Sequence, residues 1–472
     1  MDLTEYERER EERIRKNQEA LLKLEIPQLA PKQAVASKPR APRSKRKPVE
    51  ETTRRVSLRT RGLAPDGTEA EKIKKEAELV AAQTRKRHSG TESFAGTLYE
   101  PDDYQAFDGD TEVSKRQNLV DSFAEKISSA PEGMYERFSG GEDRKTGAGR
   151  ILDMKIIGEE PQRKVLVSRV YSVNIHPRRD RILVGAGDTK GFFGLMHLDD
   201  ESRPSLLRME PHSRTITAIR SNPVETDQMY TTSHDCTLRR LDLTRQEFVT
   251  IREDEERDGS TDINFIEPRV LAYCTSRGYV GVVDTRAKKH PSWEKQLHEK
   301  KIGSISVCSK TNALVTASND CTVAVFDLRK VDTKKTLASF SHGRAVSNGV
   351  LSENGKSILT TSYDDTLRIY SNVKGNWKDK PQVYKHDNNT GRWITKFKAE
   401  WYPQEPGVFV CGSMKRPHGL DVFDATTNDH SITGKLMSEY LSAIPARHAF
   451  HPEMDILATG NASGRLCIWT AP

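Results

Sequence analysis

The sequence of 472 residues lacks the short motifs on which most enzymes and metal-binding proteins depend. It contains no Gly-rich phosphate loop and no nucleophile motif, and its 13 histidines are scattered. None of its six cysteines forms a Cys-x-x-Cys pair, and no His-x-x-x-His sequence lies near them. We therefore expect a protein that is not an enzyme and that has no catalytic residues, metal site or cofactor.

Long apolar runs are also missing. No stretch is long enough to cross a bilayer. The first residues, Met1 to Arg8, have no apolar core and so do not form a secretory signal. Most of the cysteines lie in short apolar runs, which is typical of buried thiols in a reducing compartment. The sequence predicts a soluble, intracellular protein that does not contact a membrane.

Apolar residues are scarce and unevenly distributed. They make up 35% of the chain, whereas charged residues reach 30%, so part of the chain is expected not to pack. Residues 1–150 show no strand-like alternation, whereas residues from about 163 onwards alternate between apolar runs and turn clusters. We predict a basic, largely disordered arm over 1–150 and a folded domain over 163–472, separated by the Gly-rich stretch 139–149.

The arm contains several segments of different composition. A helix is predicted over about 4–24, where Thr4 and Glu7 have capping-box spacing; it either folds against a partner or is a solvated charged helix. Residues 31–61 contain 11 Lys or Arg against 2 acidic residues. They could follow phosphates, direct nuclear import or form a solvated tail. Residues 69–87 are compatible with a helix, and the acidic, aromatic segment 99–112 has no assigned role.

The C-terminal part contains a unit that recurs seven times. Each copy is typical of a strand, a tight turn and a second strand. Asp235 and Asp320 occupy equivalent turn positions two repeats apart, a separation that fits the ~40–45-residue period of WD repeats. Only a closed ring hides the edges of so many small sheets. We therefore predict an all-β, seven-bladed WD-repeat β-propeller, in which residues 164–168 supply the outer strand that closes the ring. The copies span 182–195, 229–242, 270–284, 314–327, 358–370, 408–423 and 456–469.

Cations gather at two positions of the repeat that lie at the same end of a blade. These positions are the turn between the second and third strands and the residues that precede the innermost strand. Six of the seven blades carry a cation there, and the third has Asp262 before its innermost strand. A ring of cations produces a focused positive potential whose natural partner is a polyanion. The alternative is a solvated face with scattered charges. The predicted DNA-binding residues are Arg169, Lys190, Arg214, Arg277, Lys301, Arg344, Arg392, Trp393, Lys396, Lys415, Arg416 and Arg447.

The loop before the sixth blade stands out among the connections. It reads His386-Asp387-Asn388-Asn389-Thr390-Gly391-Arg392-Trp393, a glycine-hinged turn with Arg392 and Trp393 at its tip. An exposed aromatic side chain beside cations can stack on a base or insert into a distorted base step. The alternative is a tryptophan that packs under the loop.

Several segments together resemble a known family. They are the opening Thr4-Glu5-Tyr6-Glu7-Arg8, the Arg-rich arm, the loop 386–393 and Met414-Lys415-Arg416-Pro417. The chain resembles the fungal DNA-damage-binding WD-repeat family, which is related to WD repeat-containing protein 76 and to the small subunit of the UV-damaged-DNA-binding complex. The resemblance implies binding to single- and double-stranded DNA with a preference for UV-damaged duplex, in the nucleus, with the cytoplasm as a second compartment. In the UV-damage subunit, a hairpin at the position of the loop 386–393 fills the gap left by an extruded lesion. The tip of that hairpin has an aromatic residue, an amide residue and a histidine, where this chain has Gly391-Arg392-Trp393.

A second function is compatible with the sequence. Asp284-Thr285-Arg286 and Asp327-Leu328-Arg329 end two consecutive blades. They resemble the Asp-x-Arg box by which WD proteins dock onto the adaptor of a cullin-type ubiquitin ligase, so Arg286 and Arg329 are candidate docking residues. The alternative is that each aspartate caps its turn and each arginine is a surface residue. The two functional hypotheses are thus a DNA-binding protein and a protein-interaction scaffold or ligase substrate receptor, with chromatin proteins as further candidate partners.

Overall fold

The computed structural model describes residues 90–99, 112–128, 138, 146–158, 162–198, 204–254, 258–287, 291–331, 335–427 and 429–471. All of them belong to the second of the chain's two units, residues 72–472. The helices predicted over 4–24 and 69–87, the basic stretch 31–61 and most of the acidic segment 99–112 lie outside the described residues. The following account therefore concerns the C-terminal domain and the segments that pack against it.

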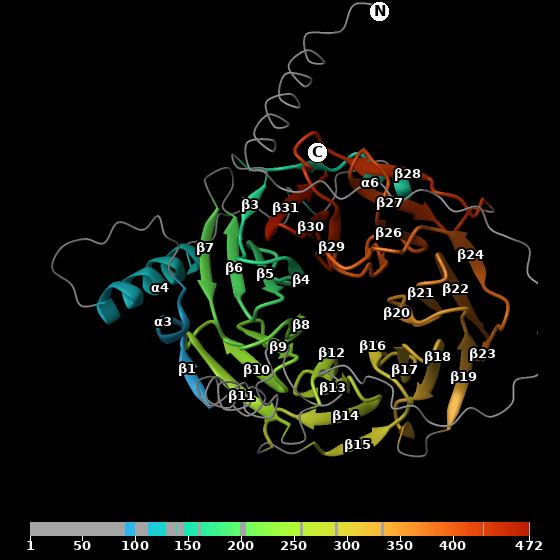
Figure 1. Cartoon of the computed structure of the whole chain (residues 1–472), viewed down its shortest axis with the longest axis horizontal. Helices are drawn as coiled ribbons and strands as arrows, with labels where there is room; N and C mark the ends of the chain where they lie inside the picture. Colours follow the sequence, from blue (N-terminus) through green and yellow to red (C-terminus); the bar gives the residue numbers. More distant parts are fainter. Residues whose placement is uncertain are drawn as a thin grey trace, which may run out of the picture. The chain divides into compact units, whose positions relative to one another are not determined.

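The described residues form seven antiparallel sheets that follow one another around a common axis (Figure 1). Blade 1 contains β4 (Val170–Ile175), β5 (Ile182–Asp188), β6 (Phe193–Leu198) and β7 (Ser205–Met209). Blade 2 contains β8 (Ile216–Ser221), β9 (Gln228–Ser233), β10 (Thr237–Asp242) and β11 (Glu247–Glu253). Blade 3 contains β12 (Ser260–Glu267), β13 (Val270–Thr275), β14 (Tyr279–Asp284) and β15 (Trp293–Gln296). Blade 4 contains β16 (Ile302–Cys308), β17 (Ala313–Ser318), β18 (Thr322–Asp327) and β19 (Thr336–Ser341).

The remaining blades vary this four-strand pattern. Blade 5 contains β20 (Val346–Leu351), β21 (Ser357–Ser362), β22 (Thr366–Val373) and β24 (Gln382–Lys385), and the short β23 (Asn376–Trp377) also pairs with β22. Blade 6 contains β25 (Glu400–Trp401), β26 (Val408–Gly412), β27 (Gly419–Asp424) and β28 (Gly434–Met437). Blade 7 contains β29 (Pro445–Phe450), β30 (Ile456–Asn461) and β31 (Arg465–Thr470). The seven-bladed β-propeller predicted from the repeat is confirmed, and each predicted copy overlaps the second and third strands of one blade.

The ring closes where the sequence indicates. Strand β3 (Arg163–Lys164) pairs with β31, and the backbone N–H groups of Val165 and Leu166 donate to the Gly464 carbonyl. The closing strand thus begins one residue before the predicted range. Strand β2 (Lys155–Ile156) pairs with the far end of β31, so two short segments cover the edge of the last blade. The edge of that sheet is therefore protected from pairing with another chain.

The hydrophobic core lies between the blades. Within the described residues, seven clusters of buried apolar side chains each join two neighbouring blades. Because neighbouring blades cover both faces of a sheet, all six residues of β17 are buried. The regular alternation of apolar and polar residues expected for a sheet with one solvated face is therefore weaker in these strands.

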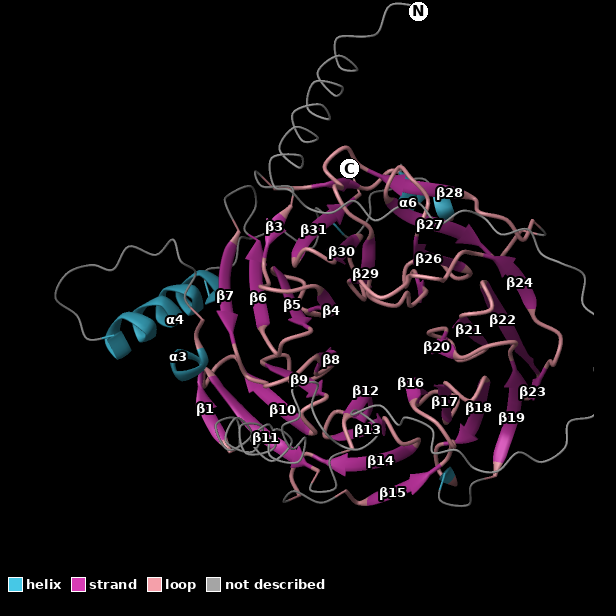
Figure 2. Ribbon diagram, viewed as in Figure 1, coloured by secondary structure: helices cyan, strands magenta, loops and turns pink. Residues whose placement is uncertain are grey.

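Part of the stretch assigned to the arm packs against the propeller. Strand β1 (Thr91–Ser93) extends blade 2 by pairing with β11, and helix α3 (Phe94–Thr97) follows it (Figure 2). Helix α4 (Glu112–Ser128) buries Val120 and Phe123 in the cluster between blades 1 and 2, and α6 (Ala148–Leu152) buries Ile151 between blades 6 and 7. The folded part thus begins before residue 163. The three residues of β1, Thr-Glu-Ser, are too few and too polar to produce a strand pattern.

We expect the buried histidines to make the folded protein less stable in acid. Burial lowers the pKa of His176, His342 and His451 to about 4 and that of His448 to about 3. Below about pH 6.5 the unfolded chain therefore binds protons that the native protein does not, and the free energy of unfolding falls as the pH decreases towards 4. Urea unfolding at pH 7.5, 6.0 and 5.0 should show this fall, and His448→Gln should make it less steep. Equal slopes in the variant and the original protein would contradict the prediction.

Candidate nucleic-acid interface

The strand topology places both sets of predicted cations at one end of the propeller. Val170, the first residue of β4, pairs with Asp188, the last residue of β5. The turn between β5 and β6 is therefore at the same end as the residues that precede β4, and the same register recurs in the other blades. We call this end, with its predicted cations, the cationic rim.

Close backbone contacts bring the rim segments of neighbouring blades together. Gly191 has φ +103°, and a Cβ at this position would lie 2.0 Å from the His212 carbonyl oxygen, so a side chain cannot be accommodated. The Thr215 hydroxyl donates to the Thr189 carbonyl at 3.0 Å. The turn that carries Lys190 is thereby fixed against the loop that carries Arg214.

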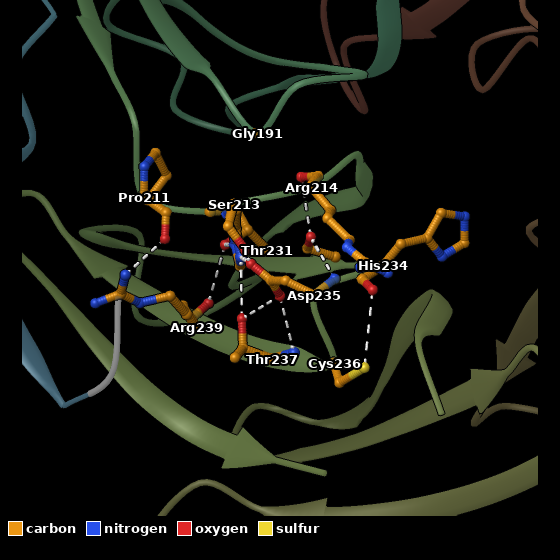
Figure 3. Close-up of polar contacts among 12 residues, drawn as sticks. Gly191, Pro211, Ser213, Arg214, Thr231, His234, Asp235, Cys236, Thr237 and Arg239 are labelled. Atoms are coloured by element: carbon orange, nitrogen blue, oxygen red, sulfur yellow. Dashed lines mark hydrogen bonds and ion pairs between the residues drawn. The ribbon is translucent and has the colours of Figure 1, made fainter. Parts of the chain in front are cut away.

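A buried polar network holds the Arg214 loop in place (Figure 3). Asp235 accepts a hydrogen bond from the Ser213 N–H at 3.0 Å and contacts His212 Nδ1 at 3.0 Å, and the Thr237 hydroxyl donates to its other oxygen at 2.7 Å. His212 Nε2 contacts the Thr231 hydroxyl at 2.9 Å. The carboxylate of Asp235 is directed towards these internal donors, and the ion pair that it forms in the described part of the chain is with His212 rather than with a rim cation. Blade 4 repeats the arrangement with His298 and Asp320.

Most of the predicted DNA-binding residues are exposed at the rim. Trp393 is 76% exposed, which supports the reading of an accessible loop tip over that of a tryptophan packed beneath the loop. Arg169 and Lys301 are half-buried. Among the ion pairs of the described residues, none joins Arg214, Arg344 or Arg392 to a carboxylate. The exposed members are Lys190, Arg214, Arg277, Arg344, Arg392, Trp393, Lys396, Lys415 and Arg416.

Arg447 and Asp262 do not lie where the sequence alignment of the repeats placed them. Arg447 is inside β29, is 7% exposed and stacks its guanidinium 5.2 Å from the centre of the Tyr171 ring. Asp262 is inside β12 and is 2% exposed. The innermost strands of both blades begin two residues before these positions, so the residues that precede the strands are earlier in the sequence than the alignment placed them. Both residues belong to the inner wall of the propeller rather than to its rim.

The loop before blade 6 is held in a defined conformation. Gly391 has φ +63°, a left-handed conformation that favours glycine. The Arg169 guanidinium donates to the Arg392 carbonyl at 2.8 Å, so blade 1 supports the loop tip. The Arg392 guanidinium lies 5.1 Å from the centre of the Trp393 ring. The tip thus presents a cation and an aromatic face together.

The base of this loop is anchored by a buried ion pair. His386 Nε2 lies 3.3 Å from Asp421, and its Nδ1 lies 2.8 Å from the Asn388 side-chain oxygen. Burial opposes the charge of the imidazole, but contacts with Cys411, Asp421 and Asn388 raise the pKa of His386 to about 11. The imidazole is therefore charged at neutral pH and fixes the loop to blade 6.

Burial and mutual repulsion lower the pKa values of several basic groups at the rim. Burial, together with the charges of Lys301 and Arg214, lowers the pKa of His234 to about 4. Desolvation lowers the pKa of Lys301 and of Lys396, and the charge of Arg447 lowers both further. These cations repel one another, and a phosphate placed among them would relieve the repulsion.

The two candidate docking arginines lie in the turns that follow the third strands of blades 3 and 4, at the opposite end from the rim. Their side chains are 63% and 67% exposed. Arg286 pairs with Asp284 at 2.5 Å, and Arg329 pairs with Asp327 at 2.7 Å. Each aspartate also accepts the backbone N–H of its arginine. The aspartates therefore cap their turns, and the arginines present a charged surface.

The described residues contain no group of three or more His, Cys, Asp or Glu side chains arranged to hold a metal ion. All six cysteines are free thiols, and five of them are buried. Among the helices that the structure describes, none is both long and apolar enough to cross a membrane.

Comparison of the sequence with known proteins identifies relatives of this chain. No protein-family model matches the chain. It is 31% identical to DNA damage-binding protein CMR1 of Phaeosphaeria nodorum, with 99% of each chain covered, and 29% identical to the protein of that name in Neurospora crassa, with 99% and 98% covered. It is also 32% identical to WD repeat-containing protein 76 of Xenopus laevis, over 67% of this chain and 56% of the relative. The resemblance found in the sequence is thereby confirmed: the chain belongs to the family of fungal proteins named DNA damage-binding protein CMR1.

Proposed function

We propose that the protein binds DNA through the cationic rim and that it acts in the nucleus as a binding protein rather than an enzyme. The observation that carries the proposal is the gathering of exposed cations from several blades at one end of a rigid disc. The turn aspartates Asp235 and Asp320 direct their oxygens to internal donors and, within the described part of the chain, do not form ion pairs with these cations, whose side chains remain accessible to phosphates. The names of the relatives, which refer to damaged DNA, support the same function.

A preference for damaged duplex is assigned to the tip of the loop before blade 6. Trp393 is exposed beside Arg392, so its ring can stack on a base that damage has already unstacked. The same contact would serve single-stranded DNA, whose bases are accessible without a cost of unpairing. The cations of residues 31–61 would add electrostatic affinity that does not depend on sequence.

Gel shifts with irradiated and intact duplex, each at two salt concentrations, test the proposal directly. We expect both duplexes to bind more weakly at the higher salt, and the irradiated duplex to bind more tightly at each concentration. Equal affinities would reduce the function to general phosphate binding. No binding to either duplex at low salt would contradict DNA binding itself.

The substitution Trp393→Ala should lower the affinity for irradiated duplex about fivefold to tenfold, because one base–aromatic stack contributes about 1–3 kcal/mol. The affinity for intact duplex should fall less. Trp393→Phe serves as the control, since it retains an aromatic face and should preserve most of the preference. The same loss of affinity for both duplexes in Trp393→Ala would show that the ring does not read damage.

A protein-interaction scaffold, with a cullin-type ligase adaptor or chromatin proteins as partners, is the second candidate function. The observation that favours it is the exposure of Arg286 and Arg329 on consecutive blades, away from the rim. Binding of a purified ligase adaptor that is lost in a double Arg286→Glu, Arg329→Glu variant would support it. Duplex affinity should be unchanged in the same variant.

A further inference from the structure

A cavity of about 520 Å³ lies at the inner wall of the propeller, at the end opposite the cationic rim. Its lining includes Glu353, Pro403 and Pro452, which lie in the turns between the first and second strands of blades 5, 6 and 7. Antiparallel pairing puts those turns at the other end of each blade from the rim turns. The cavity is therefore separate from the proposed DNA-binding surface.

The deep part of the cavity wall contains two cations and two carboxylates, and a third cation acts on this group from outside the lining. Lys398 Nζ lies 3.1 Å from one Asp262 oxygen, and Arg220 Nη2 lies 3.4 Å from the other. Asp262 is 2% exposed, so these two cations share one buried carboxylate. Arg447 lies close enough to act electrostatically on this group, and its buried Nε has no hydrogen-bond partner among the described residues. Three cations thus act on two carboxylates, Asp262 and Glu400, although Arg447 itself does not line the cavity.

Glu400 does not cancel this excess. Among the ion pairs of the described residues none includes Glu400, although Arg220, Arg447 and Lys398 all act on it. Burial raises the pKa of Glu400 to about 7. The three cations oppose this rise, and the negative charge of Asp262 adds to it. Near neutral pH a substantial fraction of Glu400 is therefore protonated, and the wall then carries more positive charge.

The mouth of the cavity continues as a groove. Trp401 and Phe450 supply apolar surface at the mouth. A second cavity of about 450 Å³ shares Glu353, Trp401 and Pro403 with the first and extends outward between blades 5 and 6 as far as Gln382. The groove is thus longer than a small anion requires and suits several residues of extended chain.

The carboxylates at the mouth are already paired with surface cations. Glu353 lies 3.1 Å from Lys310, and Glu453 pairs with Arg179. They therefore repel an incoming anion less than unpaired carboxylates would. Inside the mouth, the ligand is closest to Arg220 and Lys398 in the cavity wall.

We propose that this cavity and groove bind an extended acidic segment of a partner protein. A glutamate or aspartate side chain of the segment enters the cavity and faces Arg220 and Lys398, and apolar residues beside it cover Trp401 and Phe450. A cationic side chain is disfavoured because it would face Arg220 and Lys398, with the charge of Arg447 behind them. Because this site lies at the end opposite the rim, the protein could hold DNA and the acidic partner at the same time.

The test uses the full chain and fluorescence anisotropy. The probe is a fluorescein-labelled nonapeptide in which glutamate alternates with leucine, and the comparison peptide has glutamine in place of glutamate. We expect the glutamate peptide to bind at least tenfold more tightly.

Arg220→Gln should weaken the binding of the glutamate peptide at least fivefold. Asn264→Glu, which adds a carboxylate to the cavity lining without removing an ion pair, should weaken it as much. Binding should also strengthen from pH 8 to pH 6 as Glu400 takes up a proton.

The matched control is Arg269→Gln, which removes an exposed arginine that is paired with Glu225 on the same end of the propeller but outside the cavity. It should leave peptide binding unchanged, and Arg220→Gln should leave duplex affinity unchanged. Equal binding of the two peptides, or equal weakening by Arg269→Gln, would overturn the proposal. Full displacement of the peptide by millimolar inorganic phosphate would also overturn it, since the site would then hold small anions only.

Discussion

Replacing Arg344, Arg392 and Lys415 together by glutamate should lower the affinity of the full chain for a DNA duplex at least tenfold at moderate salt. The three residues are exposed at the cationic rim of blades 5 and 6, and the loop tip that carries Arg392 is fixed by Arg169. Each lost phosphate contact removes about 0.9 from the slope of log affinity against log salt. Reversal also places three carboxylates against the duplex. Gel shifts at several salt concentrations would therefore show a weaker affinity and a shallower slope.

A triple variant at the other end of the propeller controls for the change in net charge. Arg269, Arg286 and Arg329 are 55–67% exposed, and each is paired with a carboxylate. Replacing these three by glutamate should leave duplex affinity within about twofold, because they lie away from the rim. If the two triple variants bind equally, the net charge rather than the rim determines affinity. An unchanged affinity in the rim variant would mean that DNA binds elsewhere on the chain.

The ring and its rim could be predicted because the repeat encodes them locally. Each copy contains a strand, a turn and a strand, so the position of a turn residue such as Lys190 follows from its place in the repeat. Arg214 and Arg344 are exposed because each precedes the innermost strand of its blade, a position that the repeat also defines. These features depend on short-range pattern and on the antiparallel pairing of neighbouring strands, which the sequence specifies directly.

The inner wall could not be predicted, because it depends on the residue at which each innermost strand begins. Arg447 and Asp262 are the third residues of β29 and β12, and the charged side chains themselves suggested a position before the strand. The contact between Lys398 and Asp262 joins residues 136 positions apart in blades that are not neighbours. Such a pair appears only when the ring is closed. The cavity beside it was therefore absent from the sequence-based prediction.

The N-terminal contribution to blade 2 was missed for a different reason. Its apolar contacts come from a few residues spread over two separate short segments, and the polar strand β1 adds one buried ion pair. Arg239 is fully buried, and its guanidinium lies 2.9 Å from Glu92 of β1 and donates to the Pro211 carbonyl at 2.6 Å. Arg239 occupies the position in β10 that Arg368 occupies in β22, but Arg368 pairs with Asp364 of its own blade, whereas the partner of Arg239 comes from outside the repeat.

The substitution Arg239→Met should lower the free energy of unfolding by about 3 kcal/mol, because it removes one member of a buried ion pair and leaves buried carbonyls without a donor. Glu92→Gln should cost less, about 1–2 kcal/mol, because the amide keeps a hydrogen bond to Arg239. Urea unfolding of the full chain measures both changes. The control is Glu247→Gln in β11, whose partner Arg245 is 71% exposed at 3.9 Å and which should change stability by about 0.5 kcal/mol or less.

Amide exchange distinguishes an integral fifth strand from a segment that merely rests on the blade. The Thr250 N–H donates to the Gly90 carbonyl at 2.9 Å, so its protection depends on β1 remaining paired with β11. In Glu92→Gln this amide should exchange faster, while amides of β9 should be unaffected. If Glu92→Gln and Glu247→Gln unfold at the same urea concentration and Thr250 exchanges equally in both, the ion pair does not anchor β1. Faster exchange of Thr250 and lower stability in Glu92→Gln would mean that residues 90–99 are part of the folded domain. Truncation at the start of the repeats would then expose the outer edge of blade 2 and the side chain of Arg239.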